Sequence, residues 1–138
     1  MVLVDTSVWV DFLRGLDAPH VNALRNLLAS DIGVGLAPPI LQELLQGAAT
    51  RERFAAWRRR FGQLPCHAPA DSRACAIDAA ELFLRCRMNG KTPRSSNDCL
   101  IAQIAIEHGL ALMHNDRDFD AIASVDTRLR IHAYAGKP

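Results

Sequence analysis

Three acidic residues follow one apolar run near the end of the chain, in the stretch LALMHNDRDFD. Asp116, Asp118 and Asp120 stand at every second position, directly after a segment that predicts a buried strand. Carboxylates crowded at a strand end repel one another, so they need a cation or several hydrogen-bond donors. The spacing resembles the start of a calcium loop. However, Ala121 stands where that loop needs glycine and Thr127 where it needs glutamate, which excludes a calcium loop.

Asp5, Glu43 and Asp98 are the other acids whose positions suit chemistry. Asp5 ends the apolar run VLV, although an aspartate there can also simply organise a turn. On a helical wheel Asp98 projects with apolar residues of NDCLIAQIAIEHG, where an unpaired charge would be very costly. The alternative for Asp98 is an ordinary first-turn acid, which the helix dipole favours by about 0.3–1 kcal/mol. Glu43 lies on the flank of its apolar stripe, where periodicity alone favours a position facing water.

Short apolar segments alternate with longer helical patterns along the chain. The predicted strands are residues 2–4, 32–37 and 110–114, with 130–134 as a candidate last strand. The predicted helices are residues 8–13, 21–29, 38–47, 51–61, 70–89, 97–108 and 119–123, with a loop over 90–96. This alternation favours an α/β fold in which helices cover both faces of a mostly parallel sheet. Such sheets bind ligands at the carboxyl ends of their strands, where acids from distant sequence would converge.

Asp116 is the acid of its run nearest to the predicted strand end, and it is therefore the preferred site residue. Asp118 is then expected to cap the short helix that begins at Phe119, or to serve as an outer metal ligand. Asp120 would lie in the first turn of that helix and face water.

A shared pocket for Asp5, Glu43, Asp98 and Asp116 would require a counter-ion, because their charges would otherwise raise one another's pKa values. Hard divalent cations with oxygen ligands are the natural solution, and both Mg²⁺ and Mn²⁺ suit carboxylates. No His or Cys spacing in the chain competes with this ligand set. A cation held by acids, with water still bound, suits the hydrolysis of phosphodiesters.

Positive charge is unevenly distributed along the chain. The formal net charge is only +1, but residues Arg51–Arg94 include ten basic and four acidic residues. Acids alone would repel a polyanion, so this segment offers the positive charge that contacts to an RNA backbone need. The residues expected to contact RNA are Arg85, Arg87, Lys91 and Arg94. The alternative is an arginine-rich face that is merely solvated.

The length of 138 residues is that of one domain, and a hydrophobic content of 49% is enough for a core. No apolar stretch reaches the roughly 18 residues that span a bilayer. The N-terminus has no basic leader, so we expect a cytoplasmic protein without a membrane segment. Without a C-x-x-C pair, free thiols are favoured over disulfides or zinc ligands at the four cysteines, Cys66, Cys75, Cys86 and Cys99.

Three stretches, VLVDTSVWVDFLRG, APPILQELLQG and NDCLIAQIAIEHGLALMHNDRDFD, resemble the PIN-domain ribonucleases, specifically the VapC-like toxins of prokaryotic toxin–antitoxin pairs. The resemblance spans nearly the whole chain, in the right order and at the right spacing. It implies a single PIN domain over residues 1–138, with a three-layer α/β/α fold. It also implies a homodimer, and inhibition by a small antitoxin that covers the active-site groove.

By the same resemblance, Asp5, Glu43, Asp98 and Asp116 match an acidic quartet that binds Mg²⁺ or Mn²⁺ and cleaves RNA through metal-activated water. The direct metal ligands would be Asp5, Asp98 and Asp116. Thr6 matches a hydroxyl residue beside the first acid that orients ligands. Members of the family vary around NDRDFD, so Asp116 and Asp118 could exchange roles.

Two other functions compete with the nuclease. One is a phosphatase of the haloacid-dehalogenase type with Asp5 as nucleophile, but that family needs a second aspartate where Ser7 stands. The other is a non-enzymatic α/β module whose acidic pocket binds a basic segment of a partner. Tight peptide binding without metal uptake would favour the module, and a phosphorylated aspartate would favour the phosphatase.

Overall fold

A three-stranded parallel sheet organises the fold, with strand order β2-β1-β3. The computed structural model describes residues 1–137. The strands are β1 (Val2–Val4), β2 (Val34–Gly35) and β3 (Ala111–Met113). β1 is central, with Val2 aligned with Val34 on one side and with Ala111 on the other. Because all three strands run in the same direction, their carboxyl ends meet at one edge.

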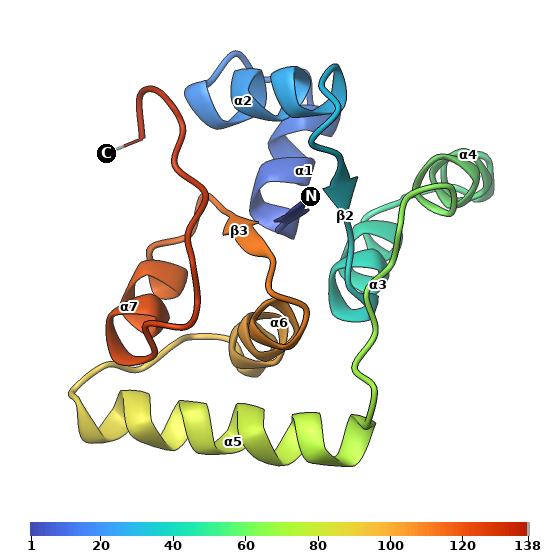
Figure 1. Ribbon diagram of the computed structural model, residues 1–138. Helices are drawn as coiled ribbons and strands as arrows, with labels where there is room; N and C mark the ends of the chain where they lie inside the picture. Colours follow the sequence, from blue (N-terminus) through green and yellow to red (C-terminus); the bar gives the residue numbers. More distant parts are fainter. Residues whose placement is uncertain (138) are drawn as a thin grey trace.

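Seven helices surround this sheet within residues 1–137. They are α1 (Thr6–Leu13), α2 (Pro19–Leu28), α3 (Pro38–Gln46), α4 (Arg51–Phe61), α5 (Ser72–Met88), α6 (Ser96–Glu107) and α7 (Arg117–Val125). Figure 1 shows α1 and α2 on one side of the strands, and α6 with the long α5 on the other. The predicted three-layer α/β/α architecture is therefore confirmed. Among the described residues, none of the helices is long and apolar enough to cross a bilayer.

Local signals in the sequence explain most helix ends. Pro38 lies in the first turn of α3, where its missing N–H costs nothing. Thr50 and Asp71 cap α4 and α5 by accepting backbone N–H groups through their side chains. Gly109 has a φ of +62°, a left-handed conformation that allows the chain to turn from α6 into β3. The acid of α6 is thereby connected to the acids that follow β3 by a short turn and strand.

The core packs against both faces of the sheet. Leu3, the middle residue of β1, has no exposed surface, as expected for a central parallel strand. Trp9 of α1 is 1% exposed and contacts Phe61 of α4 edge to face, with ring centroids 5.1 Å apart. All four cysteines are free thiols, as predicted, and three of them are buried.

Three sequence predictions about elements differ from the structure. Residues 130–134 do not form a strand; Leu112 donates to the Arg130 carbonyl and His132 donates to the Leu112 carbonyl, which makes one isolated parallel bridge to Ile131. The last helix begins at residue 117 rather than 119, and Asp116 caps it instead of Asp118. The reason is that the Asp116 carboxylate accepts the backbone N–H of Asp118, the usual N-cap contact. The predicted strand over residues 32–37 is shorter, covering only Val34–Gly35.

The first prediction concerns packing at the end of α4. Phe61→Ala should lower the free energy of unfolding by about 3–5 kcal/mol, because it leaves a cavity beside Trp9. Urea denaturation followed by circular dichroism measures this loss. Phe54→Ala is the matched control on the same helix; Phe54 is 43% exposed, so its truncation should cost less than about 0.5 kcal/mol. Equal losses in the two variants would contradict the packing described above.

Candidate active site

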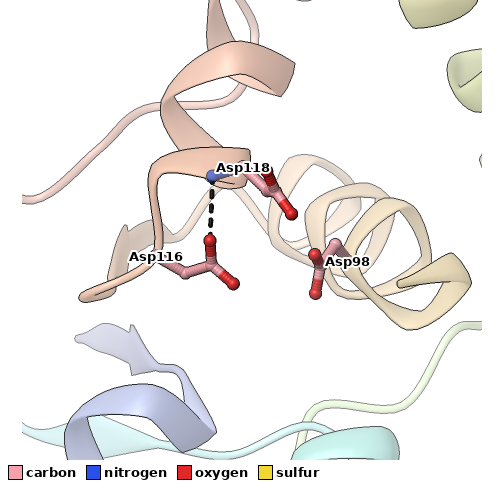
Figure 2. A group of neighbouring side chains, drawn as sticks. All are labelled: Asp98, Asp116 and Asp118. Atoms are coloured by element: carbon pink, nitrogen blue, oxygen red, sulfur yellow. Dashed lines mark hydrogen bonds between the residues drawn. The ribbon is translucent and has the colours of Figure 1, made fainter. Parts of the chain in front are cut away.

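Three carboxylates from two elements meet beyond the carboxyl end of β3. Asp98, Asp116 and Asp118 each offer one oxygen, and these oxygens lie within 4.8 Å of one another. Figure 2 shows Asp98 projecting from α6 toward Asp116 and Asp118, which stand at the start of α7. The structure therefore brings Asp118 into the same cluster as Asp116. These are the two residues that, by the family resemblance, could exchange roles.

Asp98 is the acid of the cluster whose negative charge is least compensated by hydrogen bonds or positive charges. It is 8% exposed, and its Oδ2 atom has no hydrogen-bond partner within residues 1–137. Burial, and after it the charges of Asp116, Asp5, Asp118 and Glu43, together raise the pKa of Asp98 to about 7. Buried carboxylate oxygens are normally paired, so a carboxylate that has an unpaired oxygen and lies beside two other acids indicates a place for a cation.

Asp116 is held at the start of α7 by local hydrogen bonds. Its Oδ1 atom accepts the N–H of Asp118 at 3.0 Å, and its own N–H donates to Nδ1 of His114 at 3.0 Å. His114 is 2% exposed, and burial lowers its pKa, so the ring is neutral. Because Nδ1 accepts, Nε2 carries the hydrogen and donates it to Asp120 at 3.1 Å. His114 thus connects the backbone of one acid to the side chain of another.

Asp5 ends β1 and caps α1. Its Oδ2 atom accepts the Ser7 hydroxyl at 2.6 Å and the Ser7 N–H at 3.0 Å. The Ser7 hydroxyl also accepts the N–H of Asn115 at 2.9 Å, which joins the ends of β1 and β3. Burial raises the pKa of Asp5 and the charge of Glu43 adds to this effect, although the Ser7 hydrogen bonds oppose it. The Thr6 hydroxyl is buried and has no hydrogen-bond partner in the described chain. The hydroxyl that contacts the Asp5 carboxylate is therefore that of Ser7 and not that of Thr6.

Glu43 approaches the cluster from α3. Its Oε1 atom accepts the side-chain amide of Asn97 at 3.1 Å, which anchors it to the residue preceding Asp98. Glu43 and Asp5 are close enough to raise the pKa of Asp98. Neither belongs to the tight group of Asp98, Asp116 and Asp118. All four acids of the predicted quartet therefore lie in one region, with Asp118 nearer to its centre than Asp5.

Asp118 receives the strongest compensation in the cluster. Its Oδ2 atom accepts the backbone N–H of Arg94 at 3.1 Å and the Nε of Arg94 at 2.9 Å. Burial alone would raise the pKa of Asp118, but these Arg94 contacts hold it below its ordinary value. Arg94 Nη2 also donates to Oδ1 of Asp116 at 2.9 Å. Arg94, which the sequence suggested for RNA contact, thus pairs with two acids of the site.

The other basic residues suggested for RNA contact differ in whether their charge is already paired with an acid within the fold. Arg85 donates to the buried carboxylate of Asp126 at 3.0 Å, so its charge is already used within the fold. Arg87 stacks over the ring of Phe83, 6.0 Å from its centroid. No ion pair of Arg87 or Lys91 occurs within residues 1–137. These two side chains remain available for an anionic partner.

The donor set fits a hard divalent cation. It consists of carboxylate oxygens only, it is partly buried, and it contains one unpaired buried oxygen. Sequence reasoning missed the contacts that hold the acids in place, made by Ser7, Arg94, Asn97 and His114. Ser7 stands two residues after Asp5, so its capping contact was within reach of sequence analysis. The Arg94 and Asn97 contacts join residues 22 or more positions apart, and only the fold reveals them.

Known proteins are similar to this chain in sequence and in fold. Residues 2–125 match the PIN domain family. The chain is 37% identical over 129 residues to VapC ribonuclease Mb1587 of Mycobacterium bovis and to ribonuclease VapC11 of Mycobacterium tuberculosis, covering 91% of this chain and 93% of each relative.

Solved structures agree on the fold at lower identity. VapBC2 from Rickettsia felis, bound to a promoter DNA fragment, gives a TM-score of 0.71 at 20% identity, covering 96% of this chain and 98% of that one. FitAcB from Neisseria gonorrhoeae gives a TM-score of 0.69 at 20% identity, with coverage of 96% and 97%. By its family match and its curated relatives, the chain belongs to the PIN-domain family, among the VapC-like proteins.

Proposed function

We propose that this protein is a metal-dependent endoribonuclease and the toxin of a toxin–antitoxin pair. The observation that carries the proposal is the buried carboxylate of Asp98, which has an unpaired oxygen and lies beside those of Asp116 and Asp118. Two relatives that share 37% of their residues with this chain are named ribonucleases, which supports RNA as the substrate. We take residues 1–138 to act as one PIN domain in the cytoplasm.

The proposed ligands are the acids of the cluster, with Mg²⁺ or Mn²⁺ as the cation. Asp98 and Asp116 would bind it directly, with Asp5 or Asp118 completing the set, and Glu43 adding negative charge. When bound, such a cation supplies a water of lowered pKa and neutralises charge on the scissile phosphate. Ser7 keeps Asp5 in one rotamer, and Asn97 does the same for Glu43. Thr6 has a buried hydroxyl that is free to orient a ligand.

A groove beside the acids suits an extended strand of RNA. It has a volume of about 510 Å³, and its lining includes Glu43 of α3 together with Arg53 and Trp57 of α4. Arg14 also lines the groove, so two cations share it with one acid of the site. Phosphate contacts by arginines give affinity without sequence preference. Arg87 and Lys91 would add contacts outside the groove.

Two protein partners complete the proposal. The structural neighbours include toxin–antitoxin complexes, such as one from Klebsiella pneumoniae, which supports a small antitoxin that covers the acidic site. A second copy of this chain is the other expected partner. The exposed side chains of Ile77, Leu84 and Met88 lie on one face of α5, since they are spaced by seven and four residues. That apolar face supports homodimer formation through α5.

The central prediction concerns the acids. Asp5→Asn and Asp98→Asn should each reduce RNA cleavage by about 10³-fold or more, because each removes a carboxylate from the site while keeping its shape. Cleavage of a labelled RNA in Mn²⁺ measures the effect, with chelator added as a control. Asp31→Asn changes an exposed acid that precedes β2, at the amino edge of the parallel sheet and therefore opposite the site, and it should cleave like the unsubstituted protein. Full activity of folded Asp98→Asn would contradict the proposal.

The pH dependence of metal binding follows from the raised pKa of Asp98, about 7. Below pH 7 the cation must displace a proton, so Mn²⁺ affinity should increase as the pH rises from 6 to 8 and level off above that. Calorimetry at pH 6 in buffers of different ionisation enthalpy should detect release of about one proton on binding. Without metal, the folded state favours protonated Asp98, so stability should fall as the pH rises through about 7.

Asp98→Asn tests both halves of this expectation. The variant should lose the proton release, and its unfolding midpoint should change less than that of the unsubstituted protein between pH 6 and pH 8. A pH-independent Mn²⁺ affinity in the unsubstituted protein would show that Asp98 is not a ligand.

The toxin assignment predicts a growth phenotype. Expression of the chain alone should arrest growth, and co-expression with the neighbouring reading frame should relieve the arrest, because an antitoxin would cover the site. Sequencing of RNA 5′ ends should reveal new ends only when the chain is expressed alone. The Asp98→Asn variant is the control, and toxicity of this variant equal to that of the unsubstituted chain would rule out RNA cleavage as the cause.

A further inference from the structure

Arg94 makes an unusual set of contacts for an exposed arginine. Its backbone N–H and Nε both donate to Oδ2 of Asp118, at 3.1 and 2.9 Å, and its Nη2 donates to Oδ1 of Asp116 at 2.9 Å. The side chain is nevertheless 67% exposed, whereas those of Asp116 and Asp118 are 26% and 12% exposed. The guanidinium therefore reaches the acids from the solvent side and spans both of them.

These contacts divide the cluster into two parts. Asp116 and Asp118 share one positive charge, supplied by Arg94. Asp98 receives none of it, and its Oδ2 atom stays without a partner in the described residues. Arg94 thus reduces the repulsion at Asp116 and Asp118, and it leaves Asp98, which is 8% exposed, without a positive charge.

A cation in this cluster would compete with Arg94 directly. The oxygens that Arg94 occupies belong to two of the three carboxylates that lie within 4.8 Å of one another. A divalent ion placed among them would stand near a fixed positive charge, and like charges at such short range repel. The guanidinium is exposed and can move into water, at the cost of its contacts with Asp116 and Asp118.

We propose that Arg94 is a built-in counter-ion of the metal-free site, and that the divalent cation must displace its side chain to bind. This inference rests on the proposed metal site and adds the residue that sets its affinity. The backbone N–H of Arg94 remains on Asp118 when the side chain leaves, so the carboxylate keeps its position. Arg94 is therefore a competitor for the acids and not a support that metal binding needs.

The test is a calorimetric titration with Mn²⁺ alone at pH 8 and constant ionic strength. Arg94→Ala should bind Mn²⁺ about three- to tenfold more tightly than the unsubstituted protein, because two exposed ion pairs no longer oppose binding. Arg94→Lys should also bind Mn²⁺ more tightly, since an ammonium cannot span two carboxylates as a guanidinium does. The increase should be smaller than for Arg94→Ala, because the positive charge is kept. Arg73→Ala is the matched control: it removes the same charge from an exposed position of α5 and should leave the affinity unchanged.

The outcomes separate this inference from the proposed function. Unchanged or weaker Mn²⁺ binding by folded Arg94→Ala, with normal binding by the unsubstituted protein, would overturn the counter-ion role alone. An equal gain in affinity for Arg73→Ala would also overturn it, because the effect would then be one of net charge. Absence of Mn²⁺ binding in the unsubstituted protein, or equal binding by Asp98→Asn, would overturn the metal site itself.

Discussion

Repulsion between carboxylates at the carboxyl edge of the parallel sheet is the constraint on which the site depends. β1 and β3 both end at this edge, and acids follow each of them. The fold offsets the repulsion with helix N-termini. Asp5 caps α1, Asp116 caps α7, and Asp98 lies in the first turn of α6. Each N-terminus carries roughly half a positive charge, so three of them facing one region favour negative side chains there.

Hydrogen bonds then determine which oxygens remain free. Ser7 occupies one oxygen of Asp5, and the Arg94 contacts occupy oxygens of Asp116 and Asp118. The carboxylate whose charge stays without compensation is that of Asp98. It projects from a largely apolar helix, and its Oδ2 atom has no hydrogen-bond donor among residues 1–137. An arrangement of this kind is preorganised for a cation, because binding needs little rearrangement of the acids themselves. Under the counter-ion proposal, the group that moves is the exposed side chain of Arg94.

The sequence was informative where a local pattern determines structure. Apolar runs ending in acids located Asp5 and Asp116, and a charged residue on an apolar helix located Asp98. The prediction of Glu43 depended on the family resemblance. Its position on the flank of the apolar stripe indicated by itself only a side chain that faces water. Asp118 was predicted only as an outer ligand or as an alternative to Asp116, because its place depends on which acid caps α7 and on Arg94 approaching from another loop. The error at residues 130–134 has a similar origin: whether an apolar segment pairs over one residue or five depends on its partner.

Asp98 lowers the stability of the metal-free fold, which indicates that a requirement other than packing places an aspartate there. A buried carboxylate without a partner stabilises nothing in the core, and the neighbouring acids increase its penalty. A neutral side chain of similar shape would remove that penalty, so packing alone gives no reason for an aspartate at this position. A ligand that binds only the folded state offsets such a penalty by mass action. Arg94 lowers the repulsion at Asp116 and Asp118 in the metal-free protein, and it leaves Oδ2 of Asp98 without a partner among residues 1–137.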